Sequence, residues 1–382
     1  MASPRFDADY TATGPGTLAG KFLRSFWQPV YQSARLPAGK AMPLQLLGEA
    51  FTLFRGKSGT AHVIAPYCAH RGLRLSVGRV EGDAVSCFYH GWTYDGKGQC
   101  IAQPAEKKSF ADKVRIASYP TQEYLGLIFC YFGEGEPPEL PRLSVYEENT
   151  FHEIRESRRD WSCFSQLENS VDEVHFAFTH RQSKFTDVGL NDEIPDLGAE
   201  ETDYGILRIG KRGNQVRRSH ILMPNCMYSM VFEHFKGWAE HIAWRVPIDD
   251  QSHVSFMIDC VHKTGADAEE YTRLRQQHRE ELKTLEPTSQ VVDRIMRGEI
   301  HQDDLPWRPD IVLIQDGVAL QGQPVWRNRR DDLLGASDRQ VIMLRQIWSR
   351  EMQAIAEGNP TKRWQVPRDL VPTSGTGQET RP

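Results

Sequence analysis

Long apolar runs are missing from this sequence, which has no stretch of about 18 consecutive apolar residues. No transmembrane helix is therefore predicted. The first ten residues, MASPRFDADY, contain no apolar core, so a secretory signal is not expected either. Together these absences indicate a cytoplasmic protein with no membrane partner.

Charge of one sign and paired cysteines are also scarce. The formal net charge is −5, with both signs mixed along 382 residues, which argues against nucleic acid as a partner. Seven cysteines do not make a disulfide framework in a chain of this length. A chain of 382 residues is long enough for two globular domains. Its 39% of hydrophobic residues is ordinary for a globular protein. Five of the cysteines have no paired spacing and are predicted to be reduced, buried thiols: Cys100, Cys130, Cys163, Cys226 and Cys260.

Two common redox signatures are absent as well. The glycines of the segment 14–20 have the wrong spacing for a dinucleotide-binding turn, enclose a proline and follow no predicted strand. The four-cysteine motif of plant-type iron–sulfur proteins is missing too. The chain is therefore not expected to take hydride from NAD(P)H by itself.

What is present is two short Cys/His pairs, Cys68-Ala-His70 and Cys87-Phe-Tyr-His90, separated by residues 71–86. Zinc would accept two thiols and two imidazoles, but its usual sites pair Cys with Cys and His with His. A Rieske [2Fe–2S] cluster needs two cysteines on one iron and two histidines on the other. Crossed pairs supply this set, with Cys68 and Cys87 on one iron and His70 and His90 on the other. Turn residues follow both pairs, as expected of two loop tips.

A second metal site is predicted from His175 and His180, in the segment Leu167–His180. Two histidines and a carboxylate with open coordination positions are typical of non-haem Fe(II) oxygenases. The apolar spacing of the segment predicts a helix. In a straight helix the two imidazoles would point about 140° apart, so the helix must end or widen between them. Alone, the pair could be ordinary helix residues; beside the cluster motif, it completes an electron path.

These motifs resemble, over nearly the whole chain, the oxygenase (α) component of the Rieske non-haem iron oxygenases. Within that family the chain is most similar to phthalate dioxygenase and to aryl-ether and N-demethylases. The likeness includes Phe26–Val30, Leu53–Arg55 and Gly126–Ile128, although Ala69 stands where many relatives have proline. The resemblance implies a mononuclear Fe(II) and O2 as co-substrate. It also implies a separate reductase, with or without a ferredoxin, that passes on electrons from NAD(P)H.

The third iron ligand must be a carboxylate from farther along the chain. Asp316 is flanked by the apolar runs Ile311–Ile314 and Val318–Leu320, and a buried charge needs a partner. The resemblance agrees, because the family's carboxylate ligand lies in such a helix, near a glutamine such as Gln321 or Gln323. The other candidates lie mostly in polar clusters, where a solvated role is the default: Asp303, Asp304, Asp310, Asp331, Asp332 and Asp338.

Asp172 lies three residues before His175, where the resemblance implies a carboxylate that bridges the two metal centres. Its oxygens could accept hydrogen bonds from His175 and from a cluster histidine of a neighbouring subunit, with His90 favoured. The resemblance implies that this histidine belongs to a neighbouring subunit, in a homotrimer of subunits arranged head to tail. An ordinary helix salt bridge is the alternative. Asn169 is predicted to be a nearby polar group, and Glu173 to point away from Asp172.

Together these features predict a terminal oxygenase that monooxygenates an aromatic small molecule by O- or N-dealkylation or by hydroxylation. Cis-dihydroxylation of an aromatic ring is the alternative, because substrate pose decides between the two. An alternative of another class is a Rieske electron-transfer protein without oxygenase activity, although a carrier would need no histidine pair. Methionine and aromatic residues are the candidates for pocket lining: Phe176, Met223, Met227, Met230, Phe232, Trp238, Trp244, Met257 and Trp307.

The predicted fold is α+β. Residues 1–140 are predicted to comprise a helical segment, over 1–40, and a small antiparallel β domain that holds the cluster. Residues 141–371 are predicted to form a larger α+β iron domain with a central antiparallel sheet, closed by a helix over 333–358. The polar tail 372–382 is predicted to be disordered.

Overall fold

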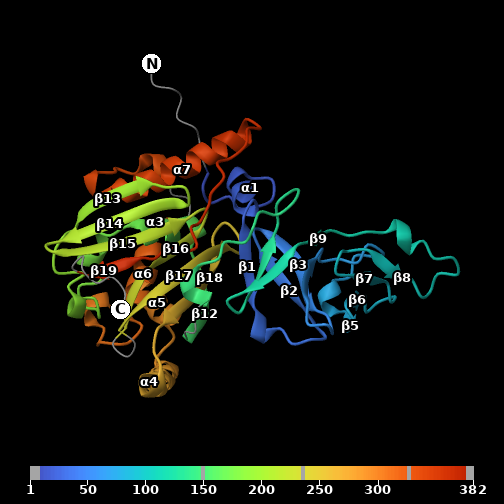
Figure 1. Cartoon of the computed structure of the whole chain (residues 1–382), viewed down its shortest axis with the longest axis horizontal. Coiled ribbons are helices and arrows are strands. Elements are labelled where there is room, and N and C mark those ends of the chain that lie inside the picture. The colour runs from blue at the N-terminus through green and yellow to red at the C-terminus, as the bar shows by residue number, and fades with distance from the viewer. Residues whose placement is uncertain (1–8, 148–150, 234–236, 325–327, 376–382) are drawn as a thin grey trace.

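The computed structural model describes residues 9–147, 151–233, 237–324 and 328–375. It confirms the predicted α+β class. A large antiparallel sheet with helices around it is joined to smaller antiparallel sheets at one end of the molecule (Figure 1). Within these residues, no helix is both long enough and apolar enough to cross a bilayer.

The N-terminal segment contains only one short helix, α1 (Leu18–Arg24), which begins where Thr17 Oγ1 accepts a hydrogen bond from the Gly20 N–H. The chain then enters strand β1 (Trp27–Gln32), so the helix expected over residues 1–40 is wrong for this stretch. Aromatic and β-branched residues favour the strand. Its register shifts next to Pro29, which has no N–H to give to the ladder.

Three small sheets build the rest of this part of the molecule, with the orders β1-β11-β10, β2-β3-β4-β9 and β5-β6-β7-β8. Short strands broken by turns agree with the small antiparallel β domain that the sequence predicts. Their bounds are β2 (Lys40–Leu46), β3 (Glu49–Arg55), β4 (Ala61–Ile64), β5 (Arg79–Glu81), β6 (Ala84–Ser86), β7 (Thr93–Asp95), β8 (Cys100–Ala102), β9 (Ser118–Tyr119), β10 (Thr121–Tyr124) and β11 (Leu127–Tyr131).

The large sheet is antiparallel throughout and has the order β12-β18-β17-β16-β15-β14-β13, with β19 paired to β15. The last strand, β19, comprises Thr373–Gly375, so the disorder predicted for 372–382 is wrong there; residues 376–382 lie outside the described residues. The other bounds are β12 (Phe151–Arg159), β13 (Asp196–Glu201), β14 (Gly205–Arg212), β15 (Gln215–Leu222), β16 (Cys226–Glu233), β17 (Gly237–Pro247) and β18 (His253–Val261).

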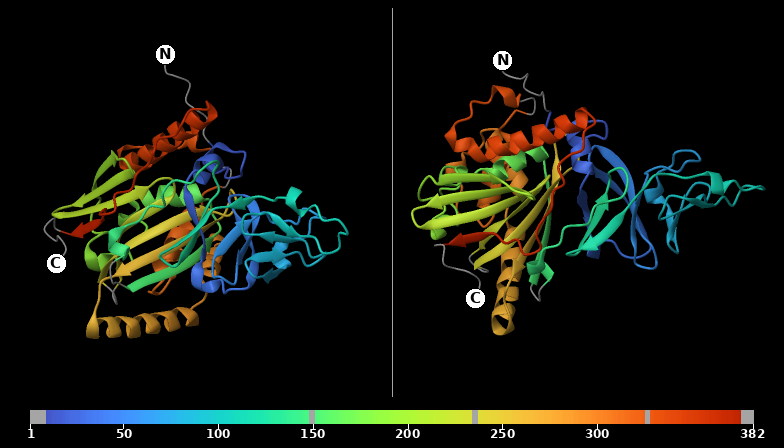
Figure 2. Two further views of the ribbon diagram at one scale, coloured as in Figure 1. Left: turned by 45° about the vertical axis from the view of Figure 1, so that its right-hand side comes forward. Right: turned by 45° about the horizontal axis from the view of Figure 1, so that its top comes forward.

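Helix α3 packs against β17 of this sheet and against α6. In α6, Gly317 allows the close approach of α5, because a Cβ there would lie 2.8 Å from a methyl carbon of Val292. Helix α4 stands apart from the sheet (Figure 2). The helix bounds are α2 (Ser144–Glu147), α3 (Cys163–Val171), α4 (Gly265–Thr284), α5 (Thr288–Met296), α6 (Ile311–Gln321) and α7 (Arg339–Ala356).

The main hydrophobic core continues from the small sheets into the large one. Phe22 of α1 packs edge-on against Trp348 of α7, and Phe129 of β11 does so against Trp244 of β17, at centroid distances of 5.2 and 5.4 Å. A separate small core surrounds the Cys/His loops. We propose the domain boundary near residue 140, where the chain passes from the last small-sheet strand to β12, although the two parts share one core.

Two buried histidines make the fold sensitive to acid. Burial lowers the pKa of His253 to about 3 and that of His220 to about 4. Both values lie below the ordinary histidine pKa of about 6.5, so the unfolded chain binds these protons first as the pH falls. Their contribution to stability is complete above about pH 6.5 and is lost progressively below it.

We expect His253→Gln to reduce this sensitivity. Lowering the pH from 7 to 5 should cost the wild type roughly 2 kcal/mol of unfolding free energy for each of the two histidines. Glutamine does not titrate, so the wild type should lose roughly 2 kcal/mol more than the variant over this range. Urea unfolding at the two pH values measures this difference. Equal losses in the two proteins would contradict the prediction.

Candidate functional site

The two Cys/His pairs lie on loops of nearly the same construction. In the first, the Cys68 N–H donates to Leu73 O (2.9 Å) and the Gly72 N–H to Cys68 O (3.0 Å). In the second, the Cys87 N–H donates to Trp92 O (2.8 Å) and the Gly91 N–H to Cys87 O (3.0 Å). The closing glycines have φ values of 71° and 74°, in the left-handed region that favours glycine.

These loops place Cys68 beside Cys87 and His70 beside His90, with the thiols buried and the imidazoles partly exposed. Cys68 and Cys87 are 3% and 4% exposed. Burial, together with the adjacent Cys68 thiol, raises the pKa of Cys87. The rings of His70 and His90 are partly exposed, with centroids 4.6 Å apart. The sequence analysis predicts this grouping, with two sulfurs for one iron and two nitrogens for the other.

The donor set fits a Rieske cluster. Two adjacent thiols can bind one iron and two adjacent imidazoles the other. Cys68 Sγ lies 3.3 Å from Tyr94 Oη, a hydroxyl that can donate to a thiolate, while the Ala69 N–H donates to the same oxygen (3.1 Å). Trp92 stacks on His70 with the two planes 6° apart, which fixes the ring orientation. Tyr94 and Trp92 were not identified from the sequence.

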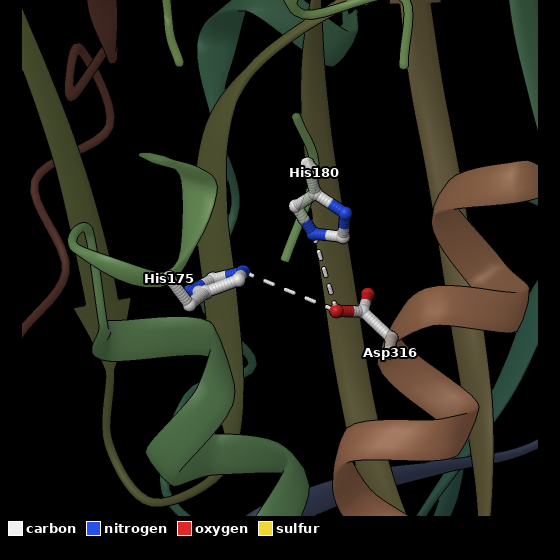
Figure 3. Close-up of side chains that lie close together, drawn as sticks. All are labelled: His175, His180 and Asp316. Carbon is white, nitrogen blue, oxygen red and sulfur yellow. Dashed lines mark ion pairs between the residues drawn. The ribbon is translucent and has the colours of Figure 1, made fainter. Parts of the chain in front are cut away.

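The second site joins His175, His180 and Asp316, which converge from α6 and from the segment after α3 (Figure 3). His180 Nε2 lies 3.3 Å from Asp316 Oδ1, and His175 Nε2 lies 3.9 Å from the same oxygen. One donor atom of each side chain lies within 4.8 Å of the other two. The structure therefore brings together the three residues that the sequence predicts as iron ligands.

The helix before the histidines ends earlier than expected. Helix α3 ends at Val171, before both histidines, and His175–Ala177 form a short 3₁₀ turn. Asp172 Oδ1 accepts from the Val174 N–H (2.7 Å), a local bond that competes with continuation of the helix. The expectation of a helix that ends or widens between the two histidines is thus wrong in position. The break lies ahead of the pair.

Polar neighbours hold each of the three side chains. His180 Nδ1 lies 2.8 Å from Gln315 Oε1, which fixes the tautomer that leaves Nε2 facing Asp316. Asn169 Nδ2 donates to Asp316 Oδ1 (3.2 Å), so Asn169 lies where the sequence predicts a nearby polar group. Gln315 was not identified from the sequence, which named Gln321 and Gln323 as the glutamines near Asp316.

A cation explains this geometry better than hydrogen bonding does. His175 Nε2 lies 3.9 Å from Asp316 Oδ1, beyond hydrogen-bond distance. His175 Nδ1 is buried without a hydrogen-bond partner among the described residues, and Asp172 Oδ2 lies 3.7 Å from it. Burial opposes ionisation of Asp316, but His180, His175 and Asn169 outweigh it and lower the pKa of the carboxyl to about 2. Imidazole nitrogens beside an ionised carboxylate suit Fe(II).

Asp310, a rival candidate for the third ligand, is engaged elsewhere. Arg308 Nε donates to Asp310 Oδ1 (2.6 Å), and Thr288 Oγ1 donates to the other oxygen (2.6 Å). This pairing satisfies the buried charge of Asp310 without a metal.

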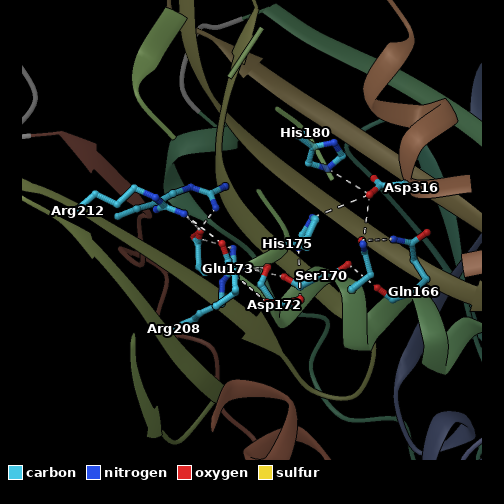
Figure 4. A network of polar contacts seen from close by, with 12 residues as sticks. Gln166, Ser170, Asp172, Glu173, His175, His180, Arg208, Arg212 and Asp316 are labelled. Carbon is cyan, nitrogen blue, oxygen red and sulfur yellow. Dashed lines mark hydrogen bonds and ion pairs between the residues drawn. The ribbon is translucent and has the colours of Figure 1, made fainter. Parts of the chain in front are cut away.

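Glu173 is buried on the other side of the same turn, 1% exposed, and forms part of a charged network (Figure 4). Its carboxylate contacts Arg217 at 2.6 Å, Arg212 at 3.4 Å and Arg208 at 3.6 Å. Burial opposes its ionisation, yet the three guanidinium groups lower its pKa to about 2. Because β14 and β15 supply these arginines, the network ties the turn before His175 to the sheet.

The three predicted iron ligands line a cavity of about 220 Å³. Of the lining residues expected from the sequence, Phe176, Met227, Met230, Trp238 and Met257 face it. Met223, Phe232, Trp244 and Trp307 do not, and Trp307 is 62% exposed. The lining also includes five arginines that were not identified from the sequence: Arg155, Arg159, Arg208, Arg217 and Arg245.

Comparison with known proteins agrees with the family that the sequence motifs resemble. Residues 26–120 match the family described as the Rieske [2Fe-2S] domain. Over 378 residues the chain is 30% identical to the 5,5'-dehydrodivanillate O-demethylase oxygenase subunit of Sphingobium sp. (strain NBRC 103272 / SYK-6), covering 95% of this chain and 83% of that protein.

Two solved structures have a similar fold. NdmB of Pseudomonas putida CBB5 aligns with a TM-score of 0.67 at 20% identity, over 92% of this chain and 97% of that one. The oxygenase in the oxygenase–ferredoxin complex of carbazole 1,9a-dioxygenase aligns with a TM-score of 0.62 at 20% identity, over 88% and 92%. At these identities the likeness concerns the fold alone.

Proposed function

Because this chain belongs to the Rieske non-haem iron oxygenases as an oxygenase subunit, we propose that it monooxygenates an aromatic small molecule. The reaction would be O- or N-dealkylation or hydroxylation, with O2 as co-substrate. The observation that carries the proposal is the convergence of His175, His180 and Asp316 on a cavity of about 220 Å³. Its lining includes aromatic and methionine side chains: Trp161, Phe176, Phe185, Trp238, Met227, Met230 and Met257.

The cofactors are a Rieske [2Fe–2S] cluster and a mononuclear Fe(II). We assign Cys68, Cys87, His70 and His90 to the first. The second is assigned to the triad of His175, His180 and Asp316. When bound, the cluster supplies single electrons and the mononuclear iron supplies reactivity toward O2.

The side chains around the triad position the reactants. Gln315 holds His180 in one tautomer, and Asn169 orients the Asp316 carboxylate by a hydrogen bond of 3.2 Å. Phe176 and Trp238 provide apolar wall on which an aromatic ring can pack, and they keep bulk water from that side of the cavity. Asn169 and Gln315 are therefore positioning residues.

Two alternatives remain. Cis-dihydroxylation uses the same ligands and differs in how the ring is presented, so product identification separates it from monooxygenation. A pure electron-transfer protein is disfavoured, because such a protein needs neither the triad nor the cavity beside it. Turnover with a matched reductase on aryl ethers, N-alkyl anilides and aromatic acids is the direct test. Loaded protein that yields no oxygenated product from any of them would overturn the proposed function.

The proposed partners are a reductase, with or without a ferredoxin, and two further copies of this chain in a cytoplasmic homotrimer. The oxygenase of carbazole 1,9a-dioxygenase, which has a similar fold, forms a complex with a ferredoxin. In this chain the sheet that contains β5–β8 lies at the opposite end of the molecule from α3 and α6 (Figure 1). A head-to-tail arrangement would bring His90 of one subunit near Asp172 of the next, whose side chain is 31% exposed.

Asp172→Asn is expected to separate electron transfer from iron binding. The amide keeps the size of the side chain and can still accept from the Val174 N–H. It has no charge with which to hold His175 and a cluster histidine together. Both metal centres should survive, while turnover falls at least ~100-fold. This is toward the upper end of the losses seen when a residue that hydrogen-bonds to a metal ligand is changed. Single-turnover oxidation of the reduced cluster measures the step directly.

The matched control for this variant is Asp303→Asn. Asp303 has the same chemistry, but its side chain is 69% exposed and pairs with His301 outside the triad. Turnover of this control should equal that of the wild type. Fast cluster oxidation in Asp172→Asn would remove the bridging role.

A further inference from the structure

Three side chains that can bind a metal lie together at one end of the large sheet. They are Glu240 of β17, Cys260 of β18 and His262, which directly follows β18. One oxygen, one sulfur and one nitrogen atom, one from each side chain, all lie within 4.8 Å of one another. In the part of the chain that the structure describes, the only other group of this kind is the predicted iron triad.

The strand register places Glu240 and Cys260 on the face of the sheet opposite to the cavity. These two residues pair directly across β17 and β18, so their side chains point to the same side. The next pair is His241 with Asp259, which points to the other side, where His241 lines the cavity. The group is therefore separate from the site beside the iron triad.

Two of the three side chains are enclosed by the protein, and the third lies at the rim. Cys260 is 0% exposed and Glu240 is 6% exposed. Helix α2 covers the thiol, because Cys260 Sγ contacts Val145 O at 3.6 Å. The side chain of His262 is 41% exposed. An ion would therefore enter past His262, with water at the remaining coordination position.

A single nitrogen atom faces both of the other potential ligands. His262 Nε2 lies 2.9 Å from Glu240 Oε2 and 3.7 Å from Cys260 Sγ. An imidazole nitrogen has either one proton or one lone pair, so it forms one strong hydrogen bond. A simple pair between His262 and Glu240 explains the shorter distance but not the approach of the thiol. A cation between the three atoms would attract all of them.

The kinds of donor atom select the metal. Thiolate and imidazole ligands favour zinc over the harder divalent ions, and zinc also accepts a carboxylate oxygen. Tetrahedral zinc bonds of about 2.0–2.3 Å separate neighbouring ligand atoms by roughly 3.3–3.6 Å. The distances of 2.9 and 3.7 Å from His262 Nε2 lie close to this range. Binding would release the proton of the Cys260 thiol to solvent.

We propose that Glu240, Cys260 and His262 form a zinc site with water as the fourth ligand. The ion joins two adjacent strands where the chain leaves the sheet. Helix α4, which begins at Gly265, follows directly and contributes to the lining of the cavity. Bound zinc therefore has a structural role, because it fixes the start of the segment that leads into α4. The inference is independent of the proposed function.

Zinc binding by protein that holds both iron centres tests the proposal. Equilibrium dialysis against Zn²⁺ gives the affinity, and metal analysis of the same samples gives zinc and iron per chain. X-ray absorption at the zinc edge then identifies the ligands. We expect zinc to bind without any loss of iron. Its spectrum should show a single sulfur neighbour at about 2.3 Å, with nitrogen and oxygen neighbours at about 2.0–2.2 Å.

The number of sulfur neighbours distinguishes this site from the other two. Zinc that displaced iron from His175, His180 and Asp316 would have no sulfur neighbour. Zinc bound at the cluster loops would have two, from Cys68 and Cys87. In both cases iron would be lost as zinc is gained. Either result, without a zinc ion that has one sulfur neighbour, would overturn the proposed site.

Cys260→Ala should remove the sulfur neighbour and weaken zinc binding at least ~100-fold, since loss of a ligand exceeds the effect of changes around one. His262→Ala should weaken binding to a similar degree. Because His262 lies at the exposed rim, this variant provides the test if Cys260→Ala does not fold. A folded variant of either kind that binds zinc as tightly as the wild type would overturn the proposal.

Two controls match the residue types that are changed. Cys226 is also a buried thiol in the same core, at 3% exposure, and its Sγ contacts Met227 O at 3.8 Å. His301 also pairs with a carboxylate, with its Nδ1 3.4 Å from Asp303 Oδ2. Cys226→Ala and His301→Ala should both bind zinc as tightly as the wild type. An equal loss of zinc in Cys226→Ala and Cys260→Ala would assign the loss to core packing and overturn the role of the Cys260 thiolate.

Discussion

Asp316→Ala is expected to yield a protein that keeps its cluster, loses its mononuclear iron and forms no product. The carboxylate is the only anionic donor within the group formed with His175 and His180, whose donor atoms all lie within 4.8 Å of one another. Two neutral imidazoles alone hold Fe(II) poorly. Turnover should fall by more than ~1,000-fold, beyond the 10- to 100-fold typical of changes around a ligand. Iron analysis should give two ions per chain instead of three, with an unchanged visible spectrum.

His175→Ala and His180→Ala should behave in the same way, since each removes one donor of the triad. Asp303→Ala serves as the control, because its side chain is 69% exposed. If Asp316→Ala kept normal iron and turnover, the ligand would be another carboxylate. Asp310, although paired with Arg308 at 2.6 Å, would then be changed next.

Cys68→Ala is the second change that is expected to abolish turnover. An alanine methyl cannot bind iron, and the remaining thiol of Cys87 cannot hold one iron of the cluster alone. The variant should lose the visible absorption and the EPR signal of the reduced cluster, and with them all turnover. Mononuclear iron should remain, because His175, His180 and Asp316 lie in the large-sheet part of the chain. Optical and EPR spectra of the purified protein give the answer before any activity assay.

Cys100→Ala separates cluster loss from damage to packing. Cys100 is buried in the same small core as Cys68, at 2% exposure against 3%. Its Sγ contacts Ala102 O at 3.5 Å, outside the four predicted cluster ligands. This variant should keep both signals. A Cys68→Ala protein that also kept them would remove the basis for the cluster assignment.

The sequence was most informative where the chemistry is local. The two Cys/His pairs each lie on a single short loop, so ligand type and spacing could be read directly. Asp316 was also accessible, because a carboxylate within an apolar run such as Ile311–Leu320 must be explained. In each case a few neighbouring residues contain the whole signal.

The end of α3 could not be placed by apolar periodicity alone. Leu167, Val171 and Val174 continue the helical spacing, yet the helix ends at Val171. What decides is the side chain of Asp172, which bonds the Val174 N–H and offers the backbone an alternative to the helix. An aspartate at such a position can end a helix, and an analysis of apolar spacing alone does not take it into account.

Residues that depend on packing between distant segments were missed altogether. Gln315 reaches His180 only because α6 lies against the segment after α3, and nothing in either segment encodes that register. Arg159 and Arg245 line the same cavity because their strands both pair with β18. Partners so far apart in the chain become visible only when the strand order is known.

The separation of His180 and Asp316 along the chain has a thermodynamic consequence. A metal ion bound by both would act as a cross-link that closes the long loop between them, which includes β13–β18 and α4–α5. An ion that binds only the folded chain adds its binding free energy to stability, about 2.7 kcal/mol when free iron exceeds its dissociation constant 100-fold. The resistance of this protein to heat and proteolysis would then rise and fall with the supply of iron.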